Sequence, residues 1–307
     1  MKPQFPPVLD GTMLSDLRAC ERKFFYARVE GLAPPEPSIH LHAGKCMASA
    51  LDAYRQVFHN NTYHGDPAEI ALATGIRTLW QKWGDPRLFE SAPKSLLACT
   101  EAFIGYWQEF PLDTDSYQLH RNAYGKPSTE FSFSLPLGVA HPETGEELLY
   151  AGRFDAIVQD PVRDSFVLPL DDKTTGQLGT NWPEQWNLRG QFLGYTYALR
   201  SAGYNCDSAL VRGIFIGKGP PRIVQKEVSI PHWLQDRWWD QTREEVEDLV
   251  QNHRNANYRY NFSDACTAYG GCDFRQLCLA RYPQQVYSAY IKRRWNPLSQ
   301  TEETEDV

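Results

Sequence analysis

The sequence predicts an α/β protein, with a sheet of mixed strand direction, flanking helices and a helical insertion. Apolar residues recur at helical spacing through much of the first 110 residues. From about residue 129 the period shortens to two, as in Phe131 and Phe133, which is typical of half-buried strands. One later helix separates these strands from two more, at about 209–217 and 222–230. This order of elements favours an α/β sheet over separate all-α and all-β domains.

The helices come first along the chain. Ser15 is a candidate N-cap for a helix that carries Cys20 and stops at Gly31. A helical tract follows from about 44 to 57, and helices continue to about 110. Asn181 and Gly203 predict the two ends of the later helix.

We therefore expect five segments. They are an N-terminal helix and linker (1–37), a mostly helical region (38–128), the sheet core (129–260), a cysteine segment (261–295) and a disordered acidic tail (296–307). The tail is expected because four of the last six residues are acidic.

Composition narrows the class of protein. At 307 residues with 42% hydrophobic residues, the chain can build a substantial core. It contains no apolar run of the ~18 residues that a membrane span needs, and it begins without a signal-peptide pattern. We expect a cytoplasmic protein with no membrane partner. The net charge of −7 is not typical of a non-specific DNA binder.

Two carboxylates and a lysine are the first candidate site. Asp155 ends an apolar run, and Asp171-Asp172-Lys173 ends the next run after a turn. On paired strands Asp155 would lie beside Asp171 and Lys173, which share a face because they are two residues apart. Carboxylates suit Mg²⁺ or Mn²⁺, and a lysine beside such an ion can offset charge on a phosphate. The pattern is also compatible with a solvated hairpin that carries surface charges.

Cysteines form the second candidate site. Cys266, Cys272 and Cys278 recur every six residues, and Cys20 is the candidate for a fourth ligand. Four thiolates suit an iron–sulfur cluster or Zn²⁺. The odd total of seven cysteines argues against a complete disulfide framework. The other three, Cys46, Cys99 and Cys206, are expected to be buried apolar residues.

Taken together, these motifs resemble the PD-(D/E)XK nuclease superfamily. The Ser15, Leu17, Cys20 and Phe24 pattern and the three later cysteines are similar to its RecB-type branch with a 4Fe–4S cluster, which includes CRISPR-associated RecB-like exonucleases and phage relatives. The resemblance implies a restriction-endonuclease-like core and an iron–sulfur clasp that joins the N- and C-terminal segments.

The resemblance also implies roles for individual residues. Asp155, Asp171 and Asp172 would bind the metal, the last through its carbonyl, and Lys173 would position water. Gln191 and Tyr195, four apart on a helix, match the Gln-x-x-x-Tyr motif near the active site. Glu130 would support the site without ligating the metal. The iron–sulfur ligands would be Cys20, Cys266, Cys272 and Cys278.

One position departs from this family pattern. In the family a histidine ligand usually stands four residues after a helical glycine, but here the residue four positions after Gly44 is Ala48.

The resemblance as a whole predicts a metal-dependent DNA exonuclease acting on ends or single strands. The alternative is a catalytically degenerate nuclease fold that binds DNA or a recombination partner. A CRISPR-type partner and an oligomer both remain open.

Overall fold

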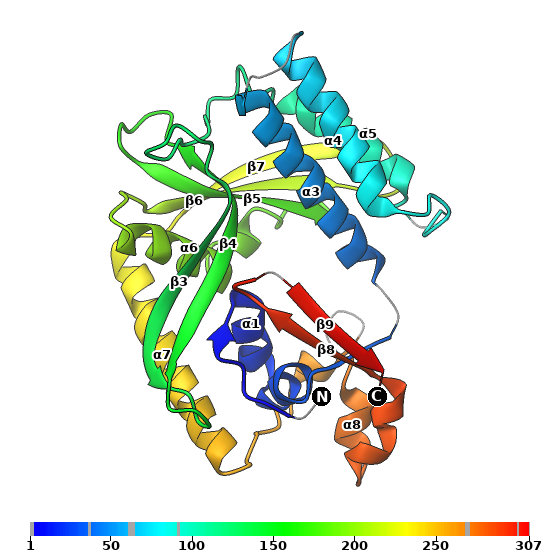
Figure 1. Ribbon diagram of the computed structural model, residues 1–307, viewed down its shortest axis with the longest axis vertical. Coiled ribbons are helices and arrows are strands. Elements are labelled where there is room, and N and C mark those ends of the chain that lie inside the picture. Colours follow the sequence, from blue (N-terminus) through cyan, green and yellow to red (C-terminus); the bar gives the residue numbers. More distant parts are fainter. Residues whose placement is uncertain are drawn as a thin grey trace. The chain divides into compact units, whose positions relative to one another are not determined.

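The protein is described from a computed structural model, and the described residues are 3–35, 38–60, 65–90, 93–267, 271–299 and 301–306. The chain forms two compact units, each built from separate stretches of sequence (Figure 1). Unit 1 comprises Met1–Glu36, Ser132–Gly152 and Asp236–Val307, and unit 2 comprises Pro37–Phe131 and Arg153–Gln235. Strands β3 (Thr129–Ala140) and β4 (Glu147–Gln159) are long and contribute residues to both units.

The sheet of unit 2 has the strand order β4-β5-β6-β7. β5 (Val167–Thr175) is antiparallel to β4 and parallel to β6 (Ser208–Phe215), while β7 (Arg222–Ser229) is antiparallel to β6. The parallel pair needs a crossover, and helix α6 (Gly190–Ser201) lies within it. Every residue of β6 is buried, as expected for a strand covered on both faces. The predicted mixed sheet is confirmed.

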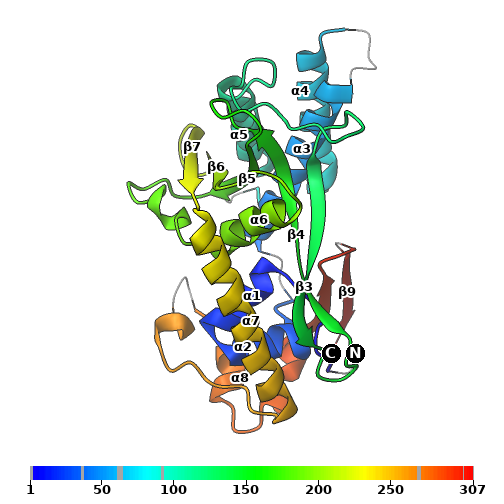
Figure 2. The ribbon, with the colours of Figure 1, turned by 90° about the vertical axis from the view of Figure 1, so that its left-hand side faces the viewer.

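Helices cover both faces of this sheet. Helices α3 (Ile39–Asn60), α4 (Pro67–Trp83) and α5 (Leu96–Glu109) pack into one apolar cluster that includes Ile214 of β6. Helix α6 lies on the opposite face (Figures 1 and 2). The expected helical region therefore shares unit 2 with the strands.

Unit 1 has its own small sheet and helices. Strands β2 (Leu32–Ala33), β8 (Ile291–Asn296) and β9 (Thr301–Asp306) form an antiparallel sheet, and β1 (Val8–Leu9) pairs in parallel with β4. The helices are α1 (Gly11–Ala19), α2 (Glu21–Phe24), a π-helical turn (Phe25–Val29), α8 (Arg275–Leu279) and 3₁₀ turns at Asp264–Cys266 and Pro283–Ala289. Helix α7 (His232–Arg254) also belongs to unit 1 from Asp236 onward. Among all described helices, none is long and apolar enough to cross a membrane.

Two helix starts differ from the sequence prediction. Helix α1 begins at Gly11 because the Asp10 carboxylate accepts a hydrogen bond from the Met13 backbone, so Ser15 lies inside the helix. The later helix begins at Gly190 rather than near Asn181, since a 3₁₀ turn (Glu184–Trp186) follows Pro183.

The expected disordered tail is also wrong for residues 301–306. They form β9, and the register places Arg294 of β8 opposite Glu303. Opposite charges that face each other across an antiparallel pair stabilise the pairing. The acidic composition of this segment is therefore not enough to predict disorder, because a basic neighbouring strand can pair with it. Residues 300 and 307 lie outside the described part of the chain.

Candidate functional site

Strands β4 and β5 bring the predicted carboxylates together in unit 2. The two strands pair as far as Ala156 opposite Leu170, and Asp155 and Asp171 are the next residues on each strand. The backbone N–H of Asp172 donates to Oδ2 of Asp155 at 2.9 Å. This bond holds the Asp155 carboxylate against β5, as the sequence predicted.

Lys173 and Gln191 complete a closed set of contacts around Asp171. The Lys173 ammonium lies 2.6 Å from Oδ2 of Asp171 and donates to Oε1 of Gln191 at 3.0 Å. The Gln191 amide in turn donates to Oδ1 of Asp171 at 2.8 Å. Helix α6 presents Gln191 from the face of the sheet that carries Asp171 and Lys173. The buried carboxylate is therefore oriented by two different donors.

Tyr195 fixes the orientation of Gln191. Its hydroxyl accepts from the Gln191 amide at 3.0 Å and donates to the Arg153 carbonyl at 2.7 Å. The two side chains are one helical turn apart, so they share a face of α6. The hydrogen bonds made by Gln191 and Tyr195 thus link α6 to both β4 and β5.

Glu130 lies at the edge of this group and not within it. Its carboxylate forms an ion pair with Arg153 at 2.7 Å. The pKa of Glu130 is raised overall. Burial is the largest cause and the Asp52 carboxylate adds to it, while the nearby Arg153 opposes both. Glu130 thus contacts the residue whose backbone carbonyl accepts a hydrogen bond from Tyr195.

The charges of the site are unbalanced. Burial raises the pKa of Asp155 well above its ordinary value, and the Asp171 and Asp172 carboxylates raise it further. Burial lowers the pKa of Lys173, but the carboxylates of Asp171 and Asp155 outweigh burial and hold it above its ordinary value. At neutral pH Lys173 is therefore an ammonium ion, and Asp155 resists ionisation unless a further cation is present.

Arg55 is a site residue that the sequence reasoning missed. It extends from α3 to the other face of β5, where its guanidinium forms a 2.5 Å ion pair with Oδ2 of Asp172. Both side chains are almost fully buried, at 2% and 3% exposure. Arg55 also donates to the Tyr106 hydroxyl, which accepts from Arg212. A signal was available, because Arg55 follows the apolar residue Leu51 by one helical turn, which places a charge on the buried side of α3.

The donor set has the chemistry of a hard-cation site. Oδ1 of Asp172 is buried without a hydrogen-bond partner, and three carboxylates share two cationic side chains. Among the described residues, however, no group of three or more His, Cys, Asp or Glu side chains is arranged to hold a metal ion. Ala48, at the position of the histidine expected from the resemblance, has no donor atom. An ion would thus depend on oxygen ligands and water.

The four predicted cluster cysteines all lie in unit 1. Each is a free, half-buried cysteine. Burial raises the pKa of Cys278 to about 11, and the nearby thiols of Cys20, Cys272 and Cys266 raise it as well. Among the described residues, which include all four of these cysteines, no group of three or more is arranged to hold a metal ion. The remaining cysteines are buried, as expected: Cys46, Cys99 and Cys206.

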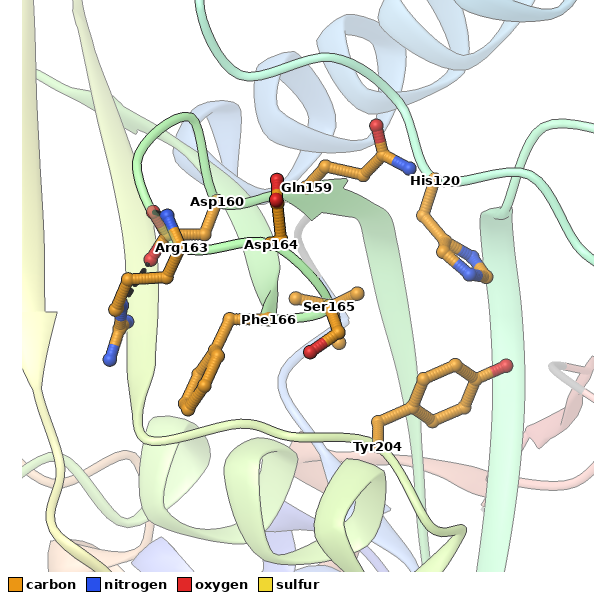
Figure 3. Close-up of a pocket in the computed structure, with 9 residues that line it drawn as sticks. His120, Gln159, Asp160, Arg163, Asp164, Ser165, Phe166 and Tyr204 are labelled. Atoms are coloured by element: carbon orange, nitrogen blue, oxygen red, sulfur yellow. Dashed lines mark hydrogen bonds and ion pairs between the residues drawn. The ribbon is translucent and has the colours of Figure 1, made fainter.

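A cavity of about 280 Å³ lies at the turn that joins β4 to β5. Its lining includes His120, Tyr204 and Arg163 (Figure 3). Arg163 is already paired with Asp160 at 2.7 Å and with Asp207 at 2.8 Å. Because Arg163 is neutralised by these two carboxylates, Asp155, Asp171 and Lys173 are the better candidate for chemistry.

One family model matches most of this chain, and the solved structures that are similar to it include the two described below. Residues 12–279 match the family model of the PD-(D/E)XK nuclease superfamily. A candidate exonuclease from Eubacterium rectale is 12% identical, with a TM-score of 0.48 and coverage of 85% of this chain and 86% of that one. The structure of SSO0001 is 14% identical, with a TM-score of 0.35 and coverage of 75% and 84%. No curated protein matches the chain.

Proposed function

Because this chain belongs to the PD-(D/E)XK nuclease superfamily, we propose that it is a metal-dependent deoxyribonuclease that acts as an exonuclease on DNA ends or single strands. One observation carries the proposal. A lysine ammonium bridges Asp171 and Gln191 directly beside the buried carboxylate of Asp155. A positive charge beside carboxylates that could bind a metal ion is the combination that hydrolysis of a phosphodiester would need.

Asp155, Asp171 and the carbonyl of Asp172 would hold Mg²⁺ or Mn²⁺. The raised pKa of Asp155 supports this assignment, since it indicates that the carboxylates of Asp155, Asp171 and Asp172 carry more negative charge than their surroundings neutralise. When bound, the ion supplies a Lewis acid for the phosphate and lowers the pKa of a bound water.

The protein's own residues supply charge and orientation. Lys173 is protonated at neutral pH, so it acts as a fixed positive charge for the developing phosphorane and not as a general base. Gln191 holds the side chains of Lys173 and Asp171 in a fixed orientation through hydrogen bonds, and Tyr195 does the same for Gln191. Glu130 supports the same arrangement through Arg153.

The nuclease activity is tested with linear and circular DNA. We expect Mg²⁺- or Mn²⁺-dependent loss of the linear form, with circular duplex spared. Equal degradation of both forms would refute the exonuclease assignment. Complete inactivity across metals and substrates, together with retained DNA binding, would instead favour the degenerate fold that Ala48 permits.

For the cysteines we propose a 4Fe–4S cluster held by Cys20, Cys266, Cys272 and Cys278. Two facts support this proposal: all four cysteines lie in unit 1, and four thiolates suit an iron–sulfur cluster. Such a cluster would link the two ends of the chain and stabilise unit 1. Anaerobically purified protein should contain iron and sulfide and absorb visible light. A colourless protein that contains stoichiometric zinc would replace the cluster with a structural Zn²⁺ site.

A further inference from the structure

Unit 2 carries a second cation near Lys173 that the proposed chemistry does not use. Arg189 is exposed, and within the described part of the chain its guanidinium has no carboxylate partner. The guanidinium carbon instead lies 5.8 Å from the centre of the Trp186 ring. An exposed arginine that is held over a ring but left without a counter-ion is available to an anionic ligand.

The aromatic residues below Arg189 connect it to the catalytic face of the sheet. Gly213 of β6 is the register partner of Lys173, so both residues point to one face. The Trp182 ring lies directly on Gly213, where a Cβ atom would overlap it. Trp182 meets Trp186 edge to face at 5.4 Å, and Trp186 supports Arg189. Arg189 is thus built onto the same face as Lys173.

The start of α6 adds to this positive surface. Arg189 is the N-cap residue of the 12-residue helix, and its side chain makes no capping hydrogen bond. The first backbone N–H groups of a helix lack intrahelical partners and favour anions. Arg189 also precedes Gln191, which binds Lys173, by only two residues. Consistent with this proximity, the charge of Arg189 lowers the pKa of Lys173.

We propose that Arg189 and the first turn of α6 bind a backbone phosphate of the DNA strand, next to the phosphate that lies at Lys173 and Asp171. This inference rests on the proposed nuclease function and extends it, because it assigns the substrate a phosphate beyond the one that is cleaved. Arg189 is a substrate-binding residue in this account. Its guanidinium offers the forked donors that suit phosphate oxygens.

The test measures DNA binding without cleavage. A fluorescently labelled single-stranded oligonucleotide is titrated with metal-free protein in EDTA at several salt concentrations. Three variants are compared with wild type: Arg189→Ala, Arg189→Met, which keeps a side chain that can pack on Trp186, and Arg189→Lys, which keeps the charge. Arg222→Ala is the matched control, because Arg222 is exposed over the Phe215 ring at 4.8 Å and lies on β7, two strands from β5.

We expect Arg189→Ala and Arg189→Met to weaken binding about tenfold, and to make the plot of log affinity against log salt shallower by about 0.7. Arg189→Lys should recover most of the affinity and the slope, and Arg222→Ala should match wild type. In cleavage assays Arg189→Ala should raise KM more than it lowers kcat.

Two results separate the possible failures. If wild type binds and cleaves DNA while Arg189→Ala and Arg189→Met keep its affinity and salt slope, the phosphate site is refuted and the nuclease stands. If wild type binds DNA without cleaving it and Arg189→Ala still weakens binding, the nuclease is refuted and the phosphate site stands. A wild-type protein that neither binds nor cleaves DNA overturns both.

Discussion

Removing the charge of Asp155 should stabilise the metal-free protein. In the Asp155→Asn variant the amide oxygen can still accept the hydrogen bond from the Asp172 backbone, so geometry is kept while one negative charge is lost. In wild type, burial and the neighbouring Asp171 and Asp172 raise the pKa of Asp155 well above the ordinary value of 3.8. The folded state therefore holds this proton more tightly than the unfolded chain.

The sign and size of the effect follow from proton linkage. Where the folded state binds more protons than the unfolded state, the unfolding free energy falls as pH rises. This fall begins near the unfolded pKa and ends above the raised folded pKa, and it amounts to about 1.4 kcal/mol for each pKa unit between them. Asparagine does not titrate, so at pH 8 the variant should be more stable than wild type by this amount, and near pH 4 the two should converge.

Urea denaturation in EDTA from pH 4 to pH 8 measures this difference. Asp164→Asn is the control, because Asp164 is an exposed acid in the turn between β4 and β5 and should change stability little. Excess Mn²⁺ should stabilise wild type but not Asp155→Asn. The difference in unfolding free energy between the two proteins should therefore shrink or change sign. An Asp155→Asn variant that is less stable than wild type at pH 8, or a difference that does not depend on pH, would refute the reasoning.

Three further predictions concern residues around the site and the cluster. Arg55→Met should lower the unfolding free energy by about 3–5 kcal/mol, because it leaves Asp172 charged, buried and unpaired, and adding Asp172→Asn should recover part of this loss in urea denaturation. Gly213→Ala should displace the Trp182 ring and shift its fluorescence emission, with a loss of about 1–3 kcal/mol from overpacking, whereas unchanged emission would contradict the contact. Cys278→Ser should reduce the iron bound per protein and the visible absorbance, and an unaltered iron content would exclude Cys278 as a ligand.

The sequence predicted those parts of the structure that depend on local patterns. The two strands around Asp155 and Asp171, and the helix that carries Gln191 and Tyr195, follow from apolar periodicity and motif spacing. Pro169 cannot donate a ladder hydrogen bond, and the ladder between β5 and β6 begins one residue later, at Leu170. The position of this proline in the sequence therefore indicates where the strand pairing of β5 changes.

Features that depend on tertiary contacts could not be predicted in this way. The pairing of Arg55 with Asp172 joins residues 117 positions apart, and nothing in the local pattern of α3 names the partner. The N-cap of α1 is Asp10 because its carboxylate reaches the Met13 backbone, although Ser15 is an equally good capping residue by type. Likewise, the strand at 301–306 exists because β8 offers a pairing edge with basic residues such as Arg294.

The central claim is that Asp155, Asp171 and Lys173 form a metal-dependent nuclease centre. Its most direct test is the single-turnover cleavage rate of linear DNA with saturating Mn²⁺, compared between wild type and Lys173→Gln. Our account predicts a loss of at least about 100-fold, because the fixed ammonium beside the reacting phosphate is removed while the side chain can still contact Gln191. A Lys173→Gln variant that cleaves DNA as fast as wild type would contradict the account.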